Sequence, residues 1–401
     1  MQTNLQREDL AAKDSESFGD EYPPQPGTNC TIITFQNTGP QRYSLYDSNS
    51  IATSAAFKDS QAGIALYAEC SLMESLLESG NTFNDRMRMK SPNSYSRLTN
   101  NTYEKQIATW YNRGGAAFTL HQNIKAHQSS SGVDKTGLGR WIWTRLRGKG
   151  ETHTRIISAY RPCLNKGIGT VWSQHFRYIK KEKQIHDPNP IRQFDSDLLA
   201  EIKKWKQMGD NLIIGIDMNA DVRTCTLSII LQANQLRNAI LTSHPLQSPP
   251  ATYDKNTSRT PIDAIWVTPN IDITRAGFTP FEGGSPSAPS DGHRMLWFEV
   301  DNFSFLGKHI PTSTPSLTAS RVKSNDPRSV KRYQRLLRKQ YGKEKIFSTT
   351  KNLIRDIQTF NLPTATPPTK EYRQNFLNTF KKKFDRHHKR TRDIRKSVDK
   401  K

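Results

Sequence analysis

Short apolar runs rich in β-branched residues recur through the first 300 residues of the chain, and polar or turn-forming residues follow each of them. Runs of this length with such boundaries are typical of β-strands. Seven or more short strands predict one or two β-sheets. The expected strands span residues 31–35, 64–68, 116–120, 141–146, 155–160, 212–216, 262–268 and 295–300.

Two segments between these strands carry apolar residues at every third or fourth position, which predicts amphipathic helices over residues 169–184 and 194–208. The second segment has Asp195 and Asp197 in its first turn, where the helix dipole favours negative charge. Its apolar stripe ends at Trp205. Helices interspersed with strands predict a protein of the α/β class.

Composition divides the chain into four parts. Residues 1–29 are polar and acidic and end in a proline-rich stretch, so we expect a disordered lead. Residues 30–303 contain the predicted strands and helices and form one expected domain. Residues 304–320 form a linker rich in serine, threonine and proline, and residues 321–401 form a basic helical tail.

Most of the net charge of the chain lies in this tail. The whole chain has a formal charge of +22, and residues 321–401 hold 25 Lys or Arg against 7 Asp or Glu. Such an excess favours a polyanionic partner, and DNA is the expected substrate, with RNA as a further candidate partner of the tail. A solvated helical face or attraction to anionic lipids would also explain a basic helix.

The four cysteines lie far apart, at positions 30, 70, 163 and 225. This spacing argues against a disulfide framework and against a structural zinc site. The polar first residues do not resemble a signal peptide, and an apolar run of about 18 residues, as a membrane span requires, does not occur. We therefore expect an intracellular, nuclear protein.

Candidate chemistry begins at Asp217 and Asn219, which follow the apolar run 212–216. In a strand, residues two apart share a face, so the carboxylate can activate water while the amide holds a phosphate oxygen. Taken alone, such a pair at the end of a strand more often marks the start of a turn. Polar residues also end or border other expected strands: Asn37, Glu69, Tyr160, Asp263, Asp291 and His293.

These residue types suit metal-assisted phosphodiester hydrolysis. The reaction needs oxygen ligands for a divalent cation, a group that orients water and donors for the charge that develops on phosphate. Oxygen ligands without a Cys or His cluster favour Mg²⁺, with Mn²⁺ as an alternative, over zinc. Asp263 lies inside an apolar strand and so needs a partner, for which His293 is the candidate.

In order and context, six of these motifs resemble the successive motifs of the endonuclease/exonuclease/phosphatase superfamily. The resemblance covers residues 30–300 and implies a four-layer α/β sandwich with two central mixed β-sheets flanked by helices and a site at one edge. The motifs are Thr34-Phe35-Gln36-Asn37, Tyr67-Ala68-Glu69, Ser158-Ala159-Tyr160-Arg161-Pro162, Gly215-Ile216-Asp217-Met218-Asn219, Pro261-Ile262-Asp263 and Ser290-Asp291-Gly292-His293-Arg294.

The resemblance also implies roles for the motif residues. Glu69 would be the main metal carboxylate, with Asn37 beside it and Asp291 as a further ligand. Asp217 would orient or deprotonate the attacking water. Asn219 and Tyr160 would donate hydrogen bonds to the scissile phosphate. His293 would stabilise the charge that develops on it, and Asp263 would fix the imidazole.

One position departs from the family pattern. The family usually has Ser-Asp-His consecutively, whereas Gly292 here separates Asp291 from His293. A glycine can form a bulge that keeps both side chains directed at the site, so activity is compatible with the insertion. A catalytically inactive, nucleic-acid-binding copy is the alternative.

Within the superfamily, the chain resembles the endonuclease of non-LTR retrotransposons most. This resemblance rests on the blocks Gly114-Gly115-Ala116, Gly137-Leu138-Gly139-Arg140-Trp141 and Asp217-Met218-Asn219, followed by Asp326-Pro327-Arg328 before a basic helical segment. It implies an endonuclease domain with the linker that leads to a reverse transcriptase, from a truncated element or a domesticated gene. A phosphatase or phosphodiesterase acting on a small or lipid phosphate is the enzyme alternative.

Overall fold

The computed structural model describes residues 17–22, 29–41, 47–77, 80–103, 113–254, 259–281 and 292–307, with isolated helical positions between 331 and 352. The chain divides into two compact units, Met1–Thr312 and Ser313–Lys401. The basic tail and the serine- and proline-rich linker lie almost wholly outside the described residues, so their expected structure stays a prediction. Among the described residues, no helix has both the length and the apolar character that a membrane span requires.

The first sheet combines strands from the two ends of the first unit. Its order is β1-β12-β13-β2-β3-β5-β4, with β2 parallel to β3 and the other neighbours antiparallel. The strands are β1 (Phe18–Gly19), β2 (Cys30–Asn37), β3 (Ile64–Ala68), β4 (Ser94–Thr99), β5 (Ala116–His121), β12 (Ile273–Phe278) and β13 (Leu296–Asp301).

The second sheet has the order β10-β11-β9-β8-β7-β6, and β8 and β9 are its parallel pair. In each sheet, the parallel pair directs two carboxyl ends to the same edge. The strands are β6 (Gln128–Val133), β7 (Trp141–Arg147), β8 (His153–Tyr160), β9 (Asn211–Asp217), β10 (Arg237–Asn238) and β11 (Asp263–Val267).

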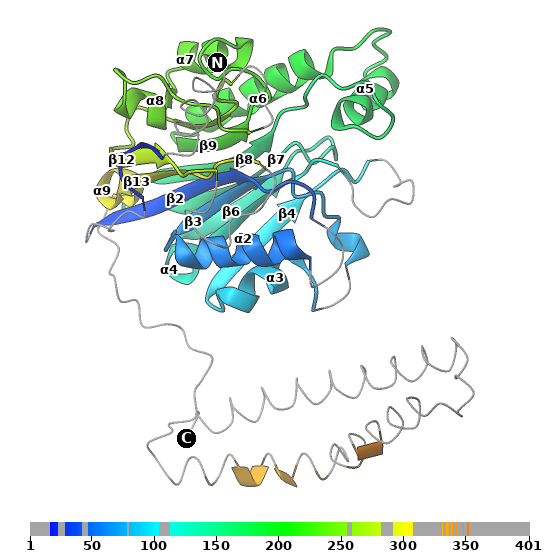
Figure 1. Cartoon of the computed structure of the whole chain (residues 1–401), viewed down its shortest axis with the longest axis vertical. Helices are drawn as coiled ribbons and strands as arrows, with labels where there is room; N and C mark the ends of the chain where they lie inside the picture. The colour runs from blue at the N-terminus through cyan, green and yellow to red at the C-terminus, as the bar shows by residue number, and fades with distance from the viewer. Residues whose placement is uncertain are drawn as a thin grey trace, which may run out of the picture. The chain divides into compact units, whose positions relative to one another are not determined.

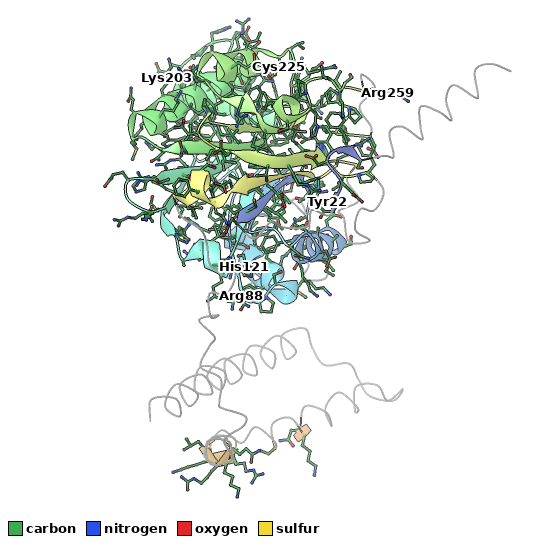
Figure 2. All side chains as sticks on the ribbon, turned by 90° about the vertical axis from the view of Figure 1, so that its left-hand side faces the viewer. Tyr22, Arg88, His121, Lys203, Cys225 and Arg259 are labelled. Atoms are coloured by element: carbon green, nitrogen blue, oxygen red, sulfur yellow. The ribbon has the colours of Figure 1, made fainter. Side chains whose placement is uncertain are left out.

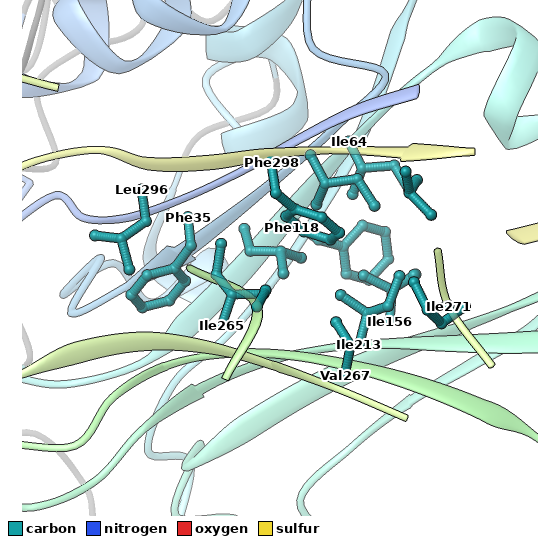
Figure 3. Packing of buried hydrophobic residues seen from close by; sticks show 14 of the residues in the cluster. Phe35, Ile64, Phe118, Ile156, Ile213, Ile265, Val267, Ile271, Leu296 and Phe298 are labelled. Carbon is teal, nitrogen blue, oxygen red and sulfur yellow. The ribbon is translucent and has the colours of Figure 1, made fainter. Parts of the chain in front are cut away.

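The two sheets pack face to face, and helices cover their outer faces (Figure 1). Phe35 and Phe118 of the first sheet meet Ile156 and Ile265 of the second in a continuous apolar core (Figure 3). Both faces of the central strands are buried, which explains why they read as unbroken apolar runs. The predicted fold class, a sandwich of two mixed sheets flanked by helices, is confirmed.

Separate apolar clusters attach the outer helices. On the second sheet, α6 (Pro190–Gln207) buries Phe194 and Trp205 against the strands. On the first sheet, Phe57 of α2 (Ser48–Asp59) and Phe83 of α3 (Phe83–Lys90) do the same. The remaining helical segments are η1 (Glu74–Leu76), α4 (Gln122–Lys125), α5 (Val171–Glu182), α7 (Thr226–Ala233), α8 (Ala239–Ser243) and α9 (Asn302–Leu306).

Both predicted helices form, and their caps set their limits. The side chain of Thr170 accepts the backbone N–H of Ser173 at the start of α5. α6 begins four residues earlier than the apolar stripe suggested, because Asn189 caps it and Pro190 occupies its first turn.

The expected disorder of the lead, residues 1–29, is wrong in one part. Phe18 pairs with Phe278 across β1 and β12, their rings lie 5.2 Å apart, and only 7% of Phe18 is exposed. Burial of the Phe18 ring, strand pairing and the contact of Tyr22 with Trp297 hold this otherwise polar segment. The remainder of the lead lies mostly outside the described residues.

The buried His175 of α5 makes the stability of the folded domain depend on pH in the acidic range. It is buried, its Nε2 has no hydrogen-bond partner among the described residues, and burial, followed by the Arg140 charge, lowers its pKa from 6.5 to about 3. Below pH 6.5 the unfolded chain therefore binds a proton that the folded chain rejects, so this stability is present above pH 6.5 and falls as the pH falls.

We expect His175→Gln to weaken this loss of stability on acidification. Wild type should lose up to about 1.4 kcal/mol per pH unit more than the variant between pH 6.5 and 4.5. Urea unfolding of both proteins at several pH values measures the difference. Equal pH dependence in the two proteins would contradict the buried, neutral state of His175.

Candidate active site

Strand ends from both sheets meet at one edge of the sandwich. Asn37 ends β2, and Glu69 directly follows the parallel strand β3. In the second sheet, Tyr160 ends β8 beside Asp217 at the end of β9, and Asp263 at the start of β11 lies opposite Asp217. The topology thus brings residues from five strands together, as the resemblance implied.

Asn37 joins the carboxylates that the two sheets contribute. Its side-chain nitrogen donates to Glu69 Oε2 at 3.0 Å and to Asp217 Oδ2 at 2.8 Å. Its side-chain oxygen accepts the backbone N–H of Gly39 at 2.8 Å, which fixes the direction of the amide. In this orientation the amide nitrogen faces the carboxylates. The geometry therefore favours a bridging role for Asn37 over the predicted role of oxygen ligand for a metal.

The backbone holds Glu69 in a conformation that non-glycine residues seldom adopt. Its φ angle is +54°, in the left-handed region. The N–H of Glu69 donates to the carbonyl of Gly115, and the N–H of Ser71 donates to that of Gly114. Both glycines also have positive φ angles, and a Cβ at Gly115 would lie 2.8 Å from the Thr99 carbonyl oxygen. The glycine pair therefore allows the tight backbone path that presents Glu69 to the site.

Asp263 and His293 form the predicted pair. Nδ1 of His293 lies 2.9 Å from Oδ2 of Asp263, and both side chains are buried. The hydroxyl of Thr252 accepts the backbone N–H of Asp263, and the ring of Tyr253 stacks on the imidazole with centroids 4.3 Å apart. The carboxylate and the ring stack therefore restrain both the direction and the plane of the imidazole.

Asp217 completes a compact buried cluster with this pair. Ligand atoms of Asp217, Asp263 and His293 all lie within 4.8 Å of one another. Burial and then the Asp263 carboxylate raise the pKa of Asp217 to about 8, against the opposing effect of His293. Burial alone would lower the pKa of His293, but Asp263 and the other nearby carboxylates raise it to about 9. The carboxylates therefore favour the protonated imidazole of His293, and a cation beside Asp217 would favour the ionised form of its carboxyl group.

Asn219 and Tyr160 lie beside the cluster. The backbone of Asn219 has a φ angle of +49°, and its N–H donates to Oδ1 of Asp217 at 2.9 Å. Its side-chain amide donates a hydrogen bond of 2.7 Å to the carbonyl of Arg161 and also hydrogen-bonds to the side chain of Tyr160. Burial, followed by the charges of Glu69 and Asp217, raises the pKa of Tyr160 well above its usual range, so its hydroxyl is a neutral donor.

The inserted Gly292 occupies a tight position. Its φ angle is +85°, and a Cβ at this position would lie 2.0 Å from Oδ1 of Asp254. The carbonyl of Gly292 accepts the N–H of Asp254, and the next residue, His293, reaches Asp263. The insertion is thus compatible with the position of the imidazole. Asp291 lies outside the described residues, so its part in the site stays a prediction.

Sequence reasoning missed three residues that support the cluster. Arg161 is buried, forms an ion pair with Asp195 and donates to the carbonyl of Met218, so it ties the turn after β9 to β8. In the sequence, the one indication of this role was the position of Arg161 directly after the candidate site residue Tyr160. Thr252 and Tyr253 lie outside the expected strands, and only tertiary structure shows that they contact Asp263 and His293.

The residues present fit a divalent cation. The carboxyl groups of Glu69, Asp217 and Asp263 come together beside a single imidazole, so acidic groups outnumber the basic one. Oδ1 of Asp263 is buried and has no hydrogen-bond partner among the described residues. Hard oxygen donors with excess negative charge suit Mg²⁺ or Mn²⁺.

Several solved structures resemble this chain at low sequence identity. The human Nocturnin catalytic domain with bound sulfate is 16% identical, with a TM-score of 0.47, and the match covers 71% of this chain and 96% of that one. An endonuclease/exonuclease/phosphatase family protein from Bacteroides thetaiotaomicron is 11% identical, with a TM-score of 0.46 and coverage of 68% and 94%. The 3' phosphatase NExo from Neisseria, bound to a product DNA hairpin, is 14% identical, with a TM-score of 0.44 and coverage of 68% and 99%.

Likenesses of this size do not identify the family or the activity of the chain. No protein-family model and no curated protein matches it.

Proposed function

We propose that this protein is a divalent-metal-dependent hydrolase that cleaves phosphodiester bonds in DNA. The observation that carries the proposal is the bridge from Glu69 through Asn37 to Asp217, next to the Asp263–His293 pair. The proximity of these side chains supports assigning carboxylates to a cation, Asp217 to a water molecule and the imidazole to the phosphate charge. Metal-assisted phosphodiester hydrolysis uses these three elements together.

Each residue has a distinct part in this proposal. Glu69 would hold the cation, with Asp291 as a further ligand, and the bound Mg²⁺ or Mn²⁺ would act as a Lewis acid on the phosphate. Asp217 would orient or deprotonate the attacking water. Asn219 and Tyr160 would donate hydrogen bonds to the phosphate oxygens. His293, held by Asp263, would stabilise the charge that develops on the phosphate.

The charge distribution supports a nucleic acid as the substrate. The last 81 residues carry 25 of the 59 Lys and Arg side chains of the chain but only 7 of its 37 acidic ones. Lys and Arg bind phosphates with little regard to sequence, which would keep DNA near the site. Several residue blocks of the chain resemble the endonucleases of non-LTR retrotransposons. We therefore propose that the protein nicks target DNA in the nucleus, as those endonucleases do.

A comparison of substrates tests the proposal. Purified full-length chain should nick supercoiled plasmid in Mg²⁺ and turn over inositol phosphates and sphingomyelin slowly or not at all. Preferred turnover of either small phosphate would instead support the phosphatase or phosphodiesterase alternative. Binding to DNA without cleavage in any divalent metal would support the inactive, nucleic-acid-binding alternative.

The tail should supply much of the affinity for DNA. Deleting residues 321–401 should weaken DNA binding and flatten its salt dependence, by about 0.9 in the slope of log K against log salt concentration for each phosphate that the tail neutralises. Fluorescence anisotropy at several salt concentrations measures both quantities.

A chain with the tail sequence scrambled is the matched control. It keeps the charge and should bind DNA as wild type does, because contacts to phosphate carry little sequence information. Unchanged affinity and salt slope after the deletion would contradict this role of the tail.

A further inference from the structure

A cavity lies on the outer face of the second sheet, where β6 and β7 meet α6. Its volume is about 340 Å³, and none of the residues of the candidate active site lines it. The cavity is instead lined by aromatic and basic side chains. These include Trp143, Trp205, Lys135, Arg145, Arg155 and Lys204.

The aromatic wall of the cavity is held in place by its neighbours. Gly132 of β6 leaves room for the indole of Trp143, because a Cβ there would lie 2.5 Å from Cζ2 of that ring. The guanidinium of Arg155 lies 4.1 Å from the Trp143 ring centroid and 5.1 Å from that of Trp205. Asp210 in turn holds Arg155 at 2.7 Å. The wall is therefore preformed, so a ligand would not have to order it on binding.

Positive charge predominates around this wall. Arg145 and Arg155 share a single carboxylate, that of Asp210, so this group of three side chains keeps a net positive charge. Glu201 is the one acidic residue in the lining and lies 3.5 Å from Lys135. Lys204 adds an exposed ammonium group. The cavity therefore combines an aromatic surface with an excess of positive charge.

We propose that this cavity binds an unpaired nucleotide of a single-stranded nucleic acid. The base would pack against the part of the Trp143 indole that remains accessible, and the phosphate would bind Lys204 and Arg145. Aromatic stacking with basic contacts to phosphate is the usual chemistry of single-strand binding and is tolerant of sequence. The site would bind a strand whether or not the chain cleaves it.

Photocrosslinking tests this proposal without any need for activity. A short oligothymidylate with one 5-iododeoxyuridine is irradiated with the full-length chain in EDTA, and the crosslinked peptides are mapped by mass spectrometry. We expect crosslinks at Trp143, whose indole is only partly buried. Lys204→Glu should lower their yield at least about fivefold, since it removes a phosphate contact and adds a repelling charge.

Lys203→Glu provides the matched control. Lys203 is the neighbouring exposed lysine on α6, does not line the cavity and is labelled on the outer surface in Figure 2. The Lys203→Glu substitution changes the net charge by the same amount as Lys204→Glu and should leave the crosslinking yield unchanged. Crosslinks confined to other parts of the chain, or equal yields from the two Glu variants, would overturn the proposal. Because the reaction contains no metal, failure here is distinguishable from failure of the proposed hydrolase.

Discussion

Replacing His293 with alanine should lower kcat for plasmid nicking by about 10³-fold, the usual cost of losing a group that stabilises charge in the transition state. The imidazole is buried against Asp263, and its raised pKa keeps it positively charged near neutral pH. That charge favours the more negative transition state over the bound substrate, so kcat should fall far more than KM rises. Initial rates of nicking over a range of DNA concentrations separate the two effects.

His186→Ala is the control for this experiment, because His186 is an exposed histidine that ends no strand. It should retain wild-type activity. Circular dichroism melting of both variants shows whether the loss reflects chemistry, since Asp263 keeps Thr252 as a backbone partner in either case. A folded His293→Ala protein with wild-type turnover would contradict the assigned role.

Replacing Glu69 with glutamine should raise the Mg²⁺ concentration needed for half-maximal cleavage at least about tenfold. The substitution keeps the size of the side chain but removes one of the carboxylates that would balance a divalent cation. It also takes the carboxylate partner from Asn37, which would then hold Asp217 alone. Higher Mg²⁺ should recover part of the lost rate, because the other carboxylates remain.

Titration of the cleavage rate with Mg²⁺ measures this shift. Glu151→Gln removes an exposed carboxylate from a turn between β7 and β8 and should leave the titration unchanged. An equal Mg²⁺ requirement for Glu69→Gln and wild type would show that Glu69 does not contribute to holding the cation.

Much of the central fold could be predicted, because buried strands leave a direct trace in the sequence. β9 is an unbroken apolar run with both faces covered, and Asp217 marks its end. Asp263 was similarly informative, since a carboxylate inside an apolar strand requires a partner and His293 is that partner.

Other elements left no such trace. β6, with the sequence Gln-Ser-Ser-Ser-Gly-Val, is a polar strand at the edge of its sheet, where side chains need not be apolar. α2 buries Ser50, Thr53 and Ser54 beside small and aromatic residues, so it shows no clear apolar stripe. In both segments tertiary contacts, rather than the periodicity of the sequence, determine the structure.

The finer features of the site also depend on tertiary contacts. The direction of the Asn37 amide follows from one backbone N–H, that of Gly39, two residues along the chain. Glutamate seldom adopts the left-handed backbone seen at Glu69, whereas asparagine tolerates it at Asn219, and surrounding hydrogen bonds hold both residues. Sequence motifs indicated which residues meet, whereas these contacts decide which atoms face one another.

The most direct test of the central claim is the nicking of supercoiled plasmid by the wild-type chain in Mg²⁺, with and without EDTA. We predict that open circles accumulate in Mg²⁺ and that EDTA abolishes them. The absence of nicking in both Mg²⁺ and Mn²⁺, or undiminished nicking in EDTA, would contradict a metal-dependent phosphodiesterase built around Asp217 and His293.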